Sequence, residues 1–183
     1  GAEGAPADPY GLAIALARAG HTAEAAHVLR ELVSDHPETV AFHRELGNLQ
    51  LRTGNPSGAT ESFRAALQRH PGDPHLQERL ARALLADNQL RQAREMARQL
   101  VREHPERAGA HHLLASAYDR LDQPIEAHRA EAEARWRSGH RSAALQQLRL
   151  AERMAQERGS PLLEQIQARI RELEPGQGQG ADA

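Results

Sequence analysis

Residues 36–71 read HPETVAFHRELGNLQLRTGNPSGATESFRAALQRHP. One His-Pro pair opens this stretch and a second one closes it. A third His-Pro pair follows, so that Pro37, Pro71 and Pro105 are spaced 34 residues apart. The same interval separates the members of two further sets, which are Gly20, Gly54, Asn88 and Asp122, and Ala25, Ala59, Ala93 and Ala127. Three sets with one period indicate an internal repeat.

Small residues recur at two places in each repeat. With the prolines at position 32, the repeats begin at Pro6, Val40, Pro74 and Ala108, and position 8 holds Ala13, Gly47, Ala81 and Ala115. Position 20 holds the four alanines named above, and small side chains at both positions let two helices cross closely. A larger side chain there is expected to overpack and to cost about 1–3 kcal/mol. Position 7 is predicted to be core, with Leu12, Leu46, Leu80 and Leu114.

Turn and cap residues predict where the helices end. Gly20, Gly54 and Asn88 suit the left-handed conformation after a helix. A capping side chain precedes proline at Asp8-Pro9, Asn55-Pro56, Asp73-Pro74 and Ser160-Pro161. We expect helices near 8–19, 22–35, 38–53, 56–69, 73–87, 90–103, 107–121, 124–138, 141–157 and 160–173.

This 34-residue helix–turn–helix unit resembles the tetratricopeptide (TPR) repeat. The resemblance implies an all-α TPR α-solenoid, a right-handed superhelix of antiparallel helix pairs with a C-terminal capping helix. We expect residues 1–5 to be an expression scar or disordered, 6–158 to hold about four and a half repeats, 159–174 to be the capping helix, and 175–183 to be a disordered tail.

The fourth repeat departs from the pattern, because Gly139 follows Asp122 by only 17 residues. The helix near 124–138 is therefore predicted to serve two hairpins. Glu131 stands at the position that Leu29 and Phe63 occupy in earlier repeats. It would then belong to two hairpins at once, with a different repeat position in each. The polar face of the last helix, which is Glu164, Gln165, Arg169 and Glu172, is predicted to face solvent, as a capping helix requires.

Composition excludes several classes of function. The net charge is −2, and all 23 basic residues are arginine, so the chain lacks the basic excess typical of nucleic-acid or anionic-membrane binding. No apolar run is long enough to insert into a bilayer. The absence of cysteine rules out disulfides and thiolate metal ligands and fits either redox compartment.

The C-terminal half resembles one TPR family in particular. The residues that carry this resemblance are 127–133, Trp136, Gly139, Ala144, Gln147, Leu148, Ala151 and 166–173, together with 10–16 and Ala19-Gly20 near the start. They are similar to the TPR domain of BepA/YfgC-like bacterial zinc metallopeptidases. The resemblance implies a periplasmic parent protein in outer-membrane protein quality control. Its TPR array would engage the parent's own protease domain, substrates or the barrel-assembly machinery.

This chain contains no H-E-x-x-H motif, so the predicted segment is not itself an enzyme. The first alternative is a stand-alone or otherwise fused bacterial TPR adaptor, which would be cytoplasmic if it stands alone. A small hydrolase that uses the histidine-rich surface is a further alternative, but no nucleophile–base pair supports it. We expect no cofactor.

The first helices of the repeats are predicted to line a partner-binding groove. Its candidate residues are Tyr10, Ile14, Arg18, Arg44, Asn48, Arg52, His75, Glu78, Arg82, His112, Ser116, Asp119 and Arg120. The arginines suit acidic or C-terminal peptide segments, because a guanidinium binds a carboxylate through two hydrogen bonds. The alternative is that they are solvated and pair locally with glutamates. A chaperone-type carboxylate clamp is incomplete, since Gly109 and Leu113 stand where it needs basic residues.

Eleven histidines raise the question of a metal site. His36, His70 and His104 recur once per repeat, which places neighbours too far apart to share a zinc ion at about 2 Å from each nitrogen. They are predicted to cap helix C-termini instead. His111, His112 and His128 could gather across one hairpin, but we expect no metal site.

Overall fold

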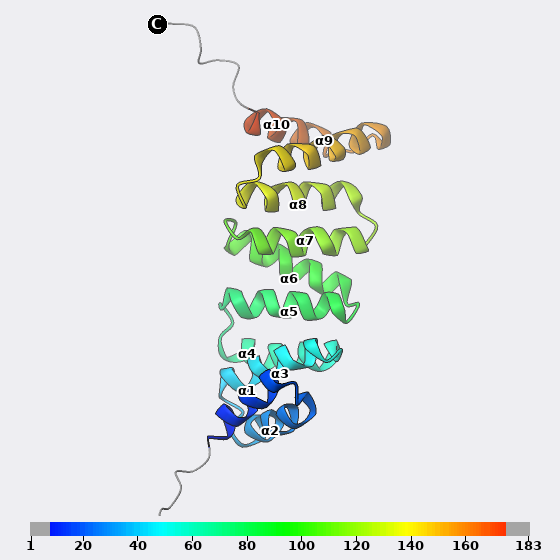
Figure 1. The fold of residues 1–183 in the computed structure, drawn as a ribbon. Helices are drawn as coiled ribbons and strands as arrows, with labels where there is room; N and C mark the ends of the chain where they lie inside the picture. Colours follow the sequence, from blue (N-terminus) through cyan, green and yellow to red (C-terminus); the bar gives the residue numbers. More distant parts are fainter. Residues whose placement is uncertain (1–7, 175–183) are drawn as a thin grey trace, which may run out of the picture. The chain divides into compact units, whose positions relative to one another are not determined.

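The computed structural model describes residues 8–174, which divide into two compact units at Gln92 and Ala93. Unit 1 contains five helices, α1 (Pro9–Ala19), α2 (Thr22–Asp35), α3 (Val40–Arg52), α4 (Pro56–Arg69) and α5 (Pro74–Ala86) (Figure 1). Helix α6 (Leu90–Glu103) begins in unit 1 and continues into unit 2, where it is followed by α7 (Ala108–Arg120), α8 (Pro124–Arg137), α9 (Arg141–Arg158) and α10 (Leu163–Leu173).

All ten predicted helices are present, and no strand occurs among the described residues. The predicted all-α fold class is confirmed. The helix boundaries agree with the prediction to within two residues, except that α10 begins at Leu163 instead of 160. The predicted disordered ends, residues 1–5 and 175–183, lie outside the described residues.

The small residues at positions 8 and 20, which form the seam between the two helices of each hairpin, are buried as predicted. Ala13, Ala25, Ala59 and Ala81 have no exposed surface, and Gly47 is also buried. A Cβ built on Gly47 would stand 2.8 Å from two ring atoms of Phe63, so glycine is required where α3 crosses α4. The seams therefore hold each hairpin together by close helix contact.

The predicted turn chemistry is also confirmed. Gly20, Gly54 and Gly139 adopt positive φ, and so do the two non-glycine residues at equivalent positions, Asn88 (φ 58°) and Asp122 (φ 56°). Asp8, Asn55, Asp73 and Ser160 each accept a hydrogen bond from a backbone N–H that follows them.

The three repeating histidines stand directly after helices, as predicted. The backbone N–H groups of His36, His70 and His104 donate to the carbonyls of Leu32, Ala66 and Leu100, respectively. Each thus closes the last turn of its helix and leads into the proline that ends it.

A second periodic feature was not predicted. The side chains of His43, Gln77 and His111 are buried, and they too are spaced 34 residues apart. His43 and His111 donate through Nε2 to the carbonyls of Pro37 and Pro105 at 2.9 Å, and Gln77 donates through Nε2 to the carbonyl of Pro71 at 3.1 Å. Each inter-repeat turn is thereby tied to the helix that follows it.

One predicted core residue is not buried. Leu12 is 50% exposed, whereas Leu46, Leu80 and Leu114 at the same repeat position are at most 8% exposed. Leu46 packs in one cluster with Leu29 of α2, the helix that precedes α3. Leu12 has no such cover, because no helix precedes α1 among residues 8–174.

Unit 2 ends differently from a regular repeat. Helix α8 packs against both α7 and α9, which confirms that one helix serves two hairpins. Helix α10 then packs on α9 through Ile166, Ile170 and Leu173, which join Leu148 and Ala151 in one core cluster.

Candidate peptide-binding surfaces

In unit 1, α1 and α3 enclose an open cavity of about 370 Å³. Its lining residues are Tyr10, Ile14, Ala17, Arg18, Glu45 and Arg52. Four of them, Tyr10, Ile14, Arg18 and Arg52, were predicted from the repeat register. Helix α1 supplies the apolar floor, and Tyr10 is fixed by the ring of Phe42 at a centroid distance of 5.3 Å. The cavity thus combines apolar surface with two guanidinium groups.

The charges at this cavity are partly paired. Arg52 donates through Nη2 to the carbonyl of Ala17 at 3.0 Å, and Arg18 is exposed. Glu45 accepts from Arg44 Nε at 3.0 Å and from Asn48 at 3.4 Å. The hydrogen bond to Glu45 raises the pKa of Arg44 above its usual value, against the opposing effect of burial. Arg18 and Arg52 therefore leave a positive excess at the mouth.

Helix α5 continues the surface within unit 1. The predicted residues His75 and Arg82 are exposed on α5, and Glu78 is half-buried. None of the three lines the α1/α3 cavity. The link between α5 and α3 is Arg79, which was not predicted and donates to Asn48 Oδ1 at 2.5 Å.

Unit 2 has a smaller cavity, of about 250 Å³, in the corresponding place on α7. It is lined by Ala115, Ser116, Asp119, Ala127, His128, Glu131 and Gln147. Of the predicted residues, Ser116 and Asp119 line it. His112 lies beside it and pairs with Glu131 at 3.0 Å, and Arg120 is exposed outside it. Asp119 and Glu131 give this surface an acidic character that unit 1 lacks.

The structure adds two carboxylates to the predicted set. Glu45 neutralises Arg44, which is the local pairing that the alternative interpretation expected, and Glu131 pairs with Arg135 at 2.9 Å as well as with His112. Glu45 could have been found from its spacing, since it precedes Asn48 by three residues and Arg52 by seven on one helix face. The position of Glu131 could not be predicted in this way, because α8 belongs to two hairpins and the 34-residue spacing is interrupted there.

The three histidines near the α7/α8 hairpin have separate partners. His111 binds the Pro105 carbonyl, His112 binds Glu131, and His128 lies 2.8 Å from Gln147 Oε1. No group of three potential metal ligands converges among residues 8–174. The described helices also include none that is long and apolar enough to span a membrane.

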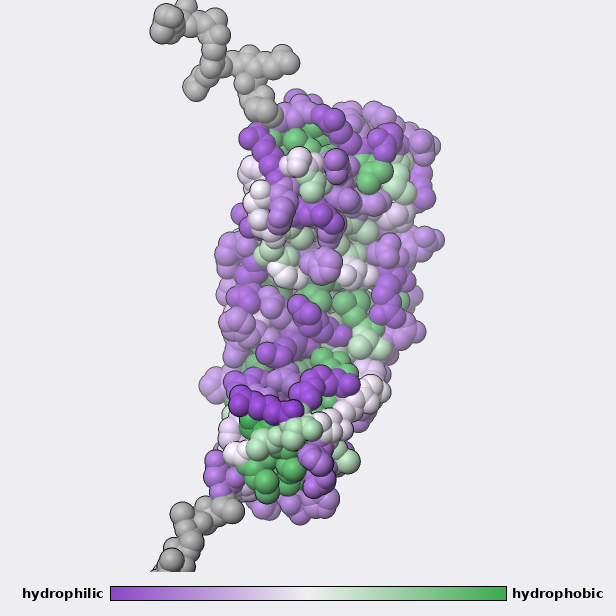
Figure 2. Space-filling view, in the orientation of Figure 1, coloured by the Kyte–Doolittle hydropathy of each residue, from purple (hydrophilic) through white to green (hydrophobic). Residues whose placement is uncertain are grey.

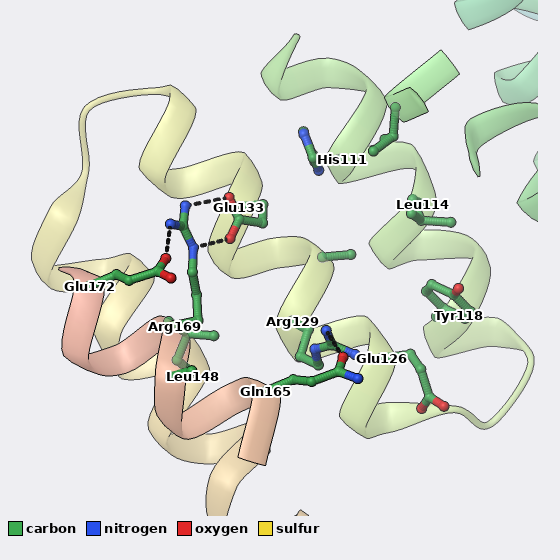
Figure 3. A pocket seen from close by; sticks show the side chains of 13 residues that line it. His111, Leu114, Tyr118, Glu126, Arg129, Glu133, Leu148, Gln165, Arg169 and Glu172 are labelled. Atoms are coloured by element: carbon green, nitrogen blue, oxygen red, sulfur yellow. Dashed lines mark hydrogen bonds and ion pairs between the residues drawn. The ribbon is translucent and has the colours of Figure 1, made fainter. Parts of the chain in front are cut away.

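A third cavity, of about 400 Å³, lies in unit 2 and was not predicted (Figure 3). Its lining residues are Val101, His111, Leu114, Tyr118, Glu126, Arg129, Ala130, Glu133, Leu148, Gln165, Ala168, Arg169 and Glu172. Arg129 donates to Gln165 at 3.1 Å across the space between α8 and α10.

Arg169 is the main link between α10 and α8. Its guanidinium donates to both carboxylate oxygens of Glu133, at 2.6 and 2.9 Å, and to Glu172 at 2.7 Å. The hydrogen bond to Glu133 contributes most to raising the pKa of Arg169, against the effect of burial. The guanidinium carbon also lies 5.9 Å from the centre of the Trp136 ring. Arg169 was predicted to face solvent, but these contacts turn it toward α8.

Two family models, both described as tetratricopeptide repeat, match the sequence, one over residues 10–74 and the other over residues 50–117. Comparison with curated protein sequences found no match. The matched region covers the regular repeats and ends in α7.

Solved structures of MamA have a similar fold. One crystal structure of MamA matches with a TM-score of 0.68 at 17% identity, covering 88% of this chain and 91% of that one. MamA 41-end from Desulfovibrio magneticus RS-1 matches with a TM-score of 0.66 at 20% identity, covering 96% and 100%. MamA AMB-1 matches with a TM-score of 0.64 at 18% identity, covering 90% and 87%. At these identities the likeness shows the fold alone. The chain is therefore a helical solenoid that carries tetratricopeptide repeats over residues 10–117, the repeat type of protein–protein interaction scaffolds.

Proposed function

We propose that the chain is an adaptor that binds partner proteins through the first helices of its repeats, either alone or fused to other domains. The observation that carries this proposal is the α1/α3 cavity, where Tyr10, Ile14, Arg18 and Arg52 come together. An extended peptide could place an apolar side chain on Ile14 and a carboxylate between the two arginines. The preferred ligand of unit 1 is accordingly an acidic segment with an apolar residue.

A labelled peptide of alternating glutamate and leucine tests this proposal by fluorescence anisotropy. Replacing Arg18 and Arg52 together by glutamate is expected to weaken binding about tenfold or more, because two charge-assisted hydrogen bonds become repulsions. Arg69→Glu, at an exposed position of α4, is the matched control and should bind as the wild type does. Equal affinity of the double variant and the control would contradict the proposal.

A narrower role is the TPR module of a BepA-like periplasmic metallopeptidase. Its support is the similarity of residues 127–173 to that family, and none of the comparisons links the chain to metallopeptidases. The adaptor function is therefore preferred, with a cytoplasmic location if the adaptor stands alone. The coding sequence upstream distinguishes the two, because a metallopeptidase requires an H-E-x-x-H helix and a secretion signal there.

The chain is proposed to act without catalysis of its own. Polar residues at both first-helix cavities are paired as structural contacts, such as Arg44 with Glu45 and Ser116 with the carbonyl of His112. In the unit 2 cavity, Ser116 donates to the carbonyl of His112 and the His128 ring lies against Gln147, so these two side chains do not form the nucleophile–base pair that acyl transfer requires. Binding assays, not turnover assays, are the appropriate test.

A further inference from the structure

The cavity of Figure 3 is separate from the two first-helix cavities, with which it shares no lining residue. Its volume of about 400 Å³ lies toward the lower end of the range that small-molecule sites have. Most of its lining comes from α7, α8 and α10. The large aliphatic side chains of the lining are Val101, Leu114 and Leu148. The cavity therefore offers a compact apolar surface with polar groups beside it.

In unit 1 the equivalent positions are bridged by side chains. Ser62 Oγ donates to Gln50 Oε1 at 2.7 Å, and a Cβ built on Gly58 would stand 2.7 Å from Gln50 Nε2. Two repeats later, these three positions are occupied by residues that all line the cavity, Ala130, Tyr118 and Glu126. A closed polar contact is thus replaced by an open space that has a carboxylate in its lining.

Two charged side chains of α8 line this cavity without pairing with an opposite charge. Arg129 is half-buried and donates to the neutral amide oxygen of Gln165 at 3.1 Å. Glu126 is also half-buried and has no hydrogen-bond or ion-pair partner among residues 8–174. The two stand three residues apart, a spacing at which opposite charges on a helix often pair. Figure 3 instead shows Arg129 turned toward α10 and Glu126 turned away from it.

The other acidic and arginine side chains that line the cavity are paired with one another. Arg169 donates to both carboxylate oxygens of Glu133 and to Glu172. The Glu172 side chain is 62% exposed, so water screens the surplus negative charge of this group. One cation, Arg129, and one anion, Glu126, are therefore left to bind a ligand.

We propose that this cavity binds a free α-amino acid with an apolar side chain. The ligand's carboxylate accepts hydrogen bonds from Arg129, its ammonium group pairs with Glu126, and its side chain packs on the aliphatic lining. A residue inside a peptide chain has neither charge, so the ligand is the free amino acid. On the face seen in Figure 2, the hydrophobic areas over α8, α9 and α10 are small and lie among hydrophilic side chains, which suits a small ligand better than a broad protein contact.

Titration of the full 183-residue chain with L-phenylalanine, followed by amide chemical shifts, tests the proposal. Saturable shifts are expected in α7, α8 and α10. The analogue 3-phenylpropanoate lacks the ammonium group, and 2-phenylethylamine lacks the carboxylate. Each should bind about tenfold more weakly than phenylalanine, because one charge-assisted hydrogen-bond partner is missing. N-acetyl-L-phenylalaninamide has neither charge and should give no saturable shift.

Variants of the chain assign each charge of the ligand to its residue. Arg129→Gln should weaken the binding of phenylalanine about tenfold but should not weaken that of 2-phenylethylamine, which has no carboxylate. Glu126→Gln should weaken the binding of phenylalanine similarly but should not weaken that of 3-phenylpropanoate. A purely structural role of either residue would weaken all three ligands alike. Arg137→Gln, at an exposed position of α8 outside the cavity, is the matched control and should bind as the wild type does.

Three outcomes would overturn the proposal. The first is that phenylalanine gives no saturable shift in α7, α8 and α10 of the wild-type chain. The second is that either single-charge analogue binds as tightly as phenylalanine. The third is that N-acetyl-L-phenylalaninamide binds equally well, because the cavity would then accept the side chain of a peptide segment.

Discussion

The two units fill the same seam in different ways. In unit 1, Gly47 of α3 faces Phe63 of α4, and the ring leaves no room for a Cβ on the glycine. Two repeats later the same positions are Ala115 and Glu131, and the Glu131 carboxylate instead reaches His112 and Arg135. One framework thus gives a dry aromatic seam in unit 1 and a polar seam with an open cavity in unit 2.

The outer hairpins of the units differ as well. The α1/α2 hairpin leaves Leu12 half exposed, whereas the equivalent face of α7 and α8 is covered by helices that include α10. Helix α10 is held by Arg169 to Glu133 and by Arg141, which donates to the carbonyl of Leu173 at 2.6 Å. The comparison indicates that a regular repeat leaves one face for a further helix, and that in unit 2 α10 helps to close this face through both apolar packing and polar contacts.

The largest effect is expected where the dry seam is emptied. Phe63→Ala should lower the free energy of unfolding of unit 1 by about 3–5 kcal/mol, because a fully buried ring leaves a cavity beneath Gly47. The measurement is amide hydrogen exchange in α3 and α4 together with urea unfolding followed by circular dichroism.

The matched control for this seam is Glu131→Ala in unit 2. This substitution should lower the free energy of unfolding by no more than about 1 kcal/mol. The half-buried Glu131 carboxylate forms its ion pairs with the exposed side chains of His112 and Arg135. If the two substitutions had equal cost, the distinction between a dry and a polar seam would be wrong.

A smaller effect is expected at the clamp of unit 2. Arg169→Ala should destabilise the docking of α10 by about 2 kcal/mol, because it removes charge-assisted hydrogen bonds to Glu133 and Glu172. Trp136 is the single tryptophan of the chain and packs against the core cluster to which α10 contributes. Its fluorescence emission should shift to the red, because loosening α10 exposes the indole ring to water. Arg171→Ala, on the exposed side of α10, should leave the emission unchanged. A red shift of similar size in both variants would show that Arg169 has no special role.

The comparison also shows what periodicity can and cannot predict. The helices, the seams and the turns followed from the 34-residue interval because each depends on backbone geometry that every repeat shares. Residues whose role depends on a neighbouring helix were harder to place. Leu12 was predicted to be buried in the core, and Arg169 was predicted to face solvent. The position of a residue within the repeat does not say which neighbouring helix packs against it.

The groove residues show the same limit. Tyr10, Ile14, Arg18 and Arg52 were brought together as the register predicted, because α1 and α3 occupy equivalent positions in adjacent repeats. Their charge balance was not predictable from register alone, since it depends on Glu45, one residue outside the expected positions. The cavity of Figure 3 had no sequence signal, because it arises where α10 departs from the repeat.

The smallest effect concerns the tie between turn and helix, which both units have. His111 in unit 2 and Gln77 in unit 1 both donate to the carbonyl of a turn proline. His111→Leu is expected to lower the free energy of unfolding by about 1 kcal/mol, because the hydrogen bond to the Pro105 carbonyl is lost. His111→Gln should recover most of this loss, since glutamine makes the same bond from Gln77. Urea unfolding followed by Trp136 emission measures both variants in unit 2, and a glutamine variant as unstable as the leucine variant would show that ring packing, not the hydrogen bond, stabilises the turn.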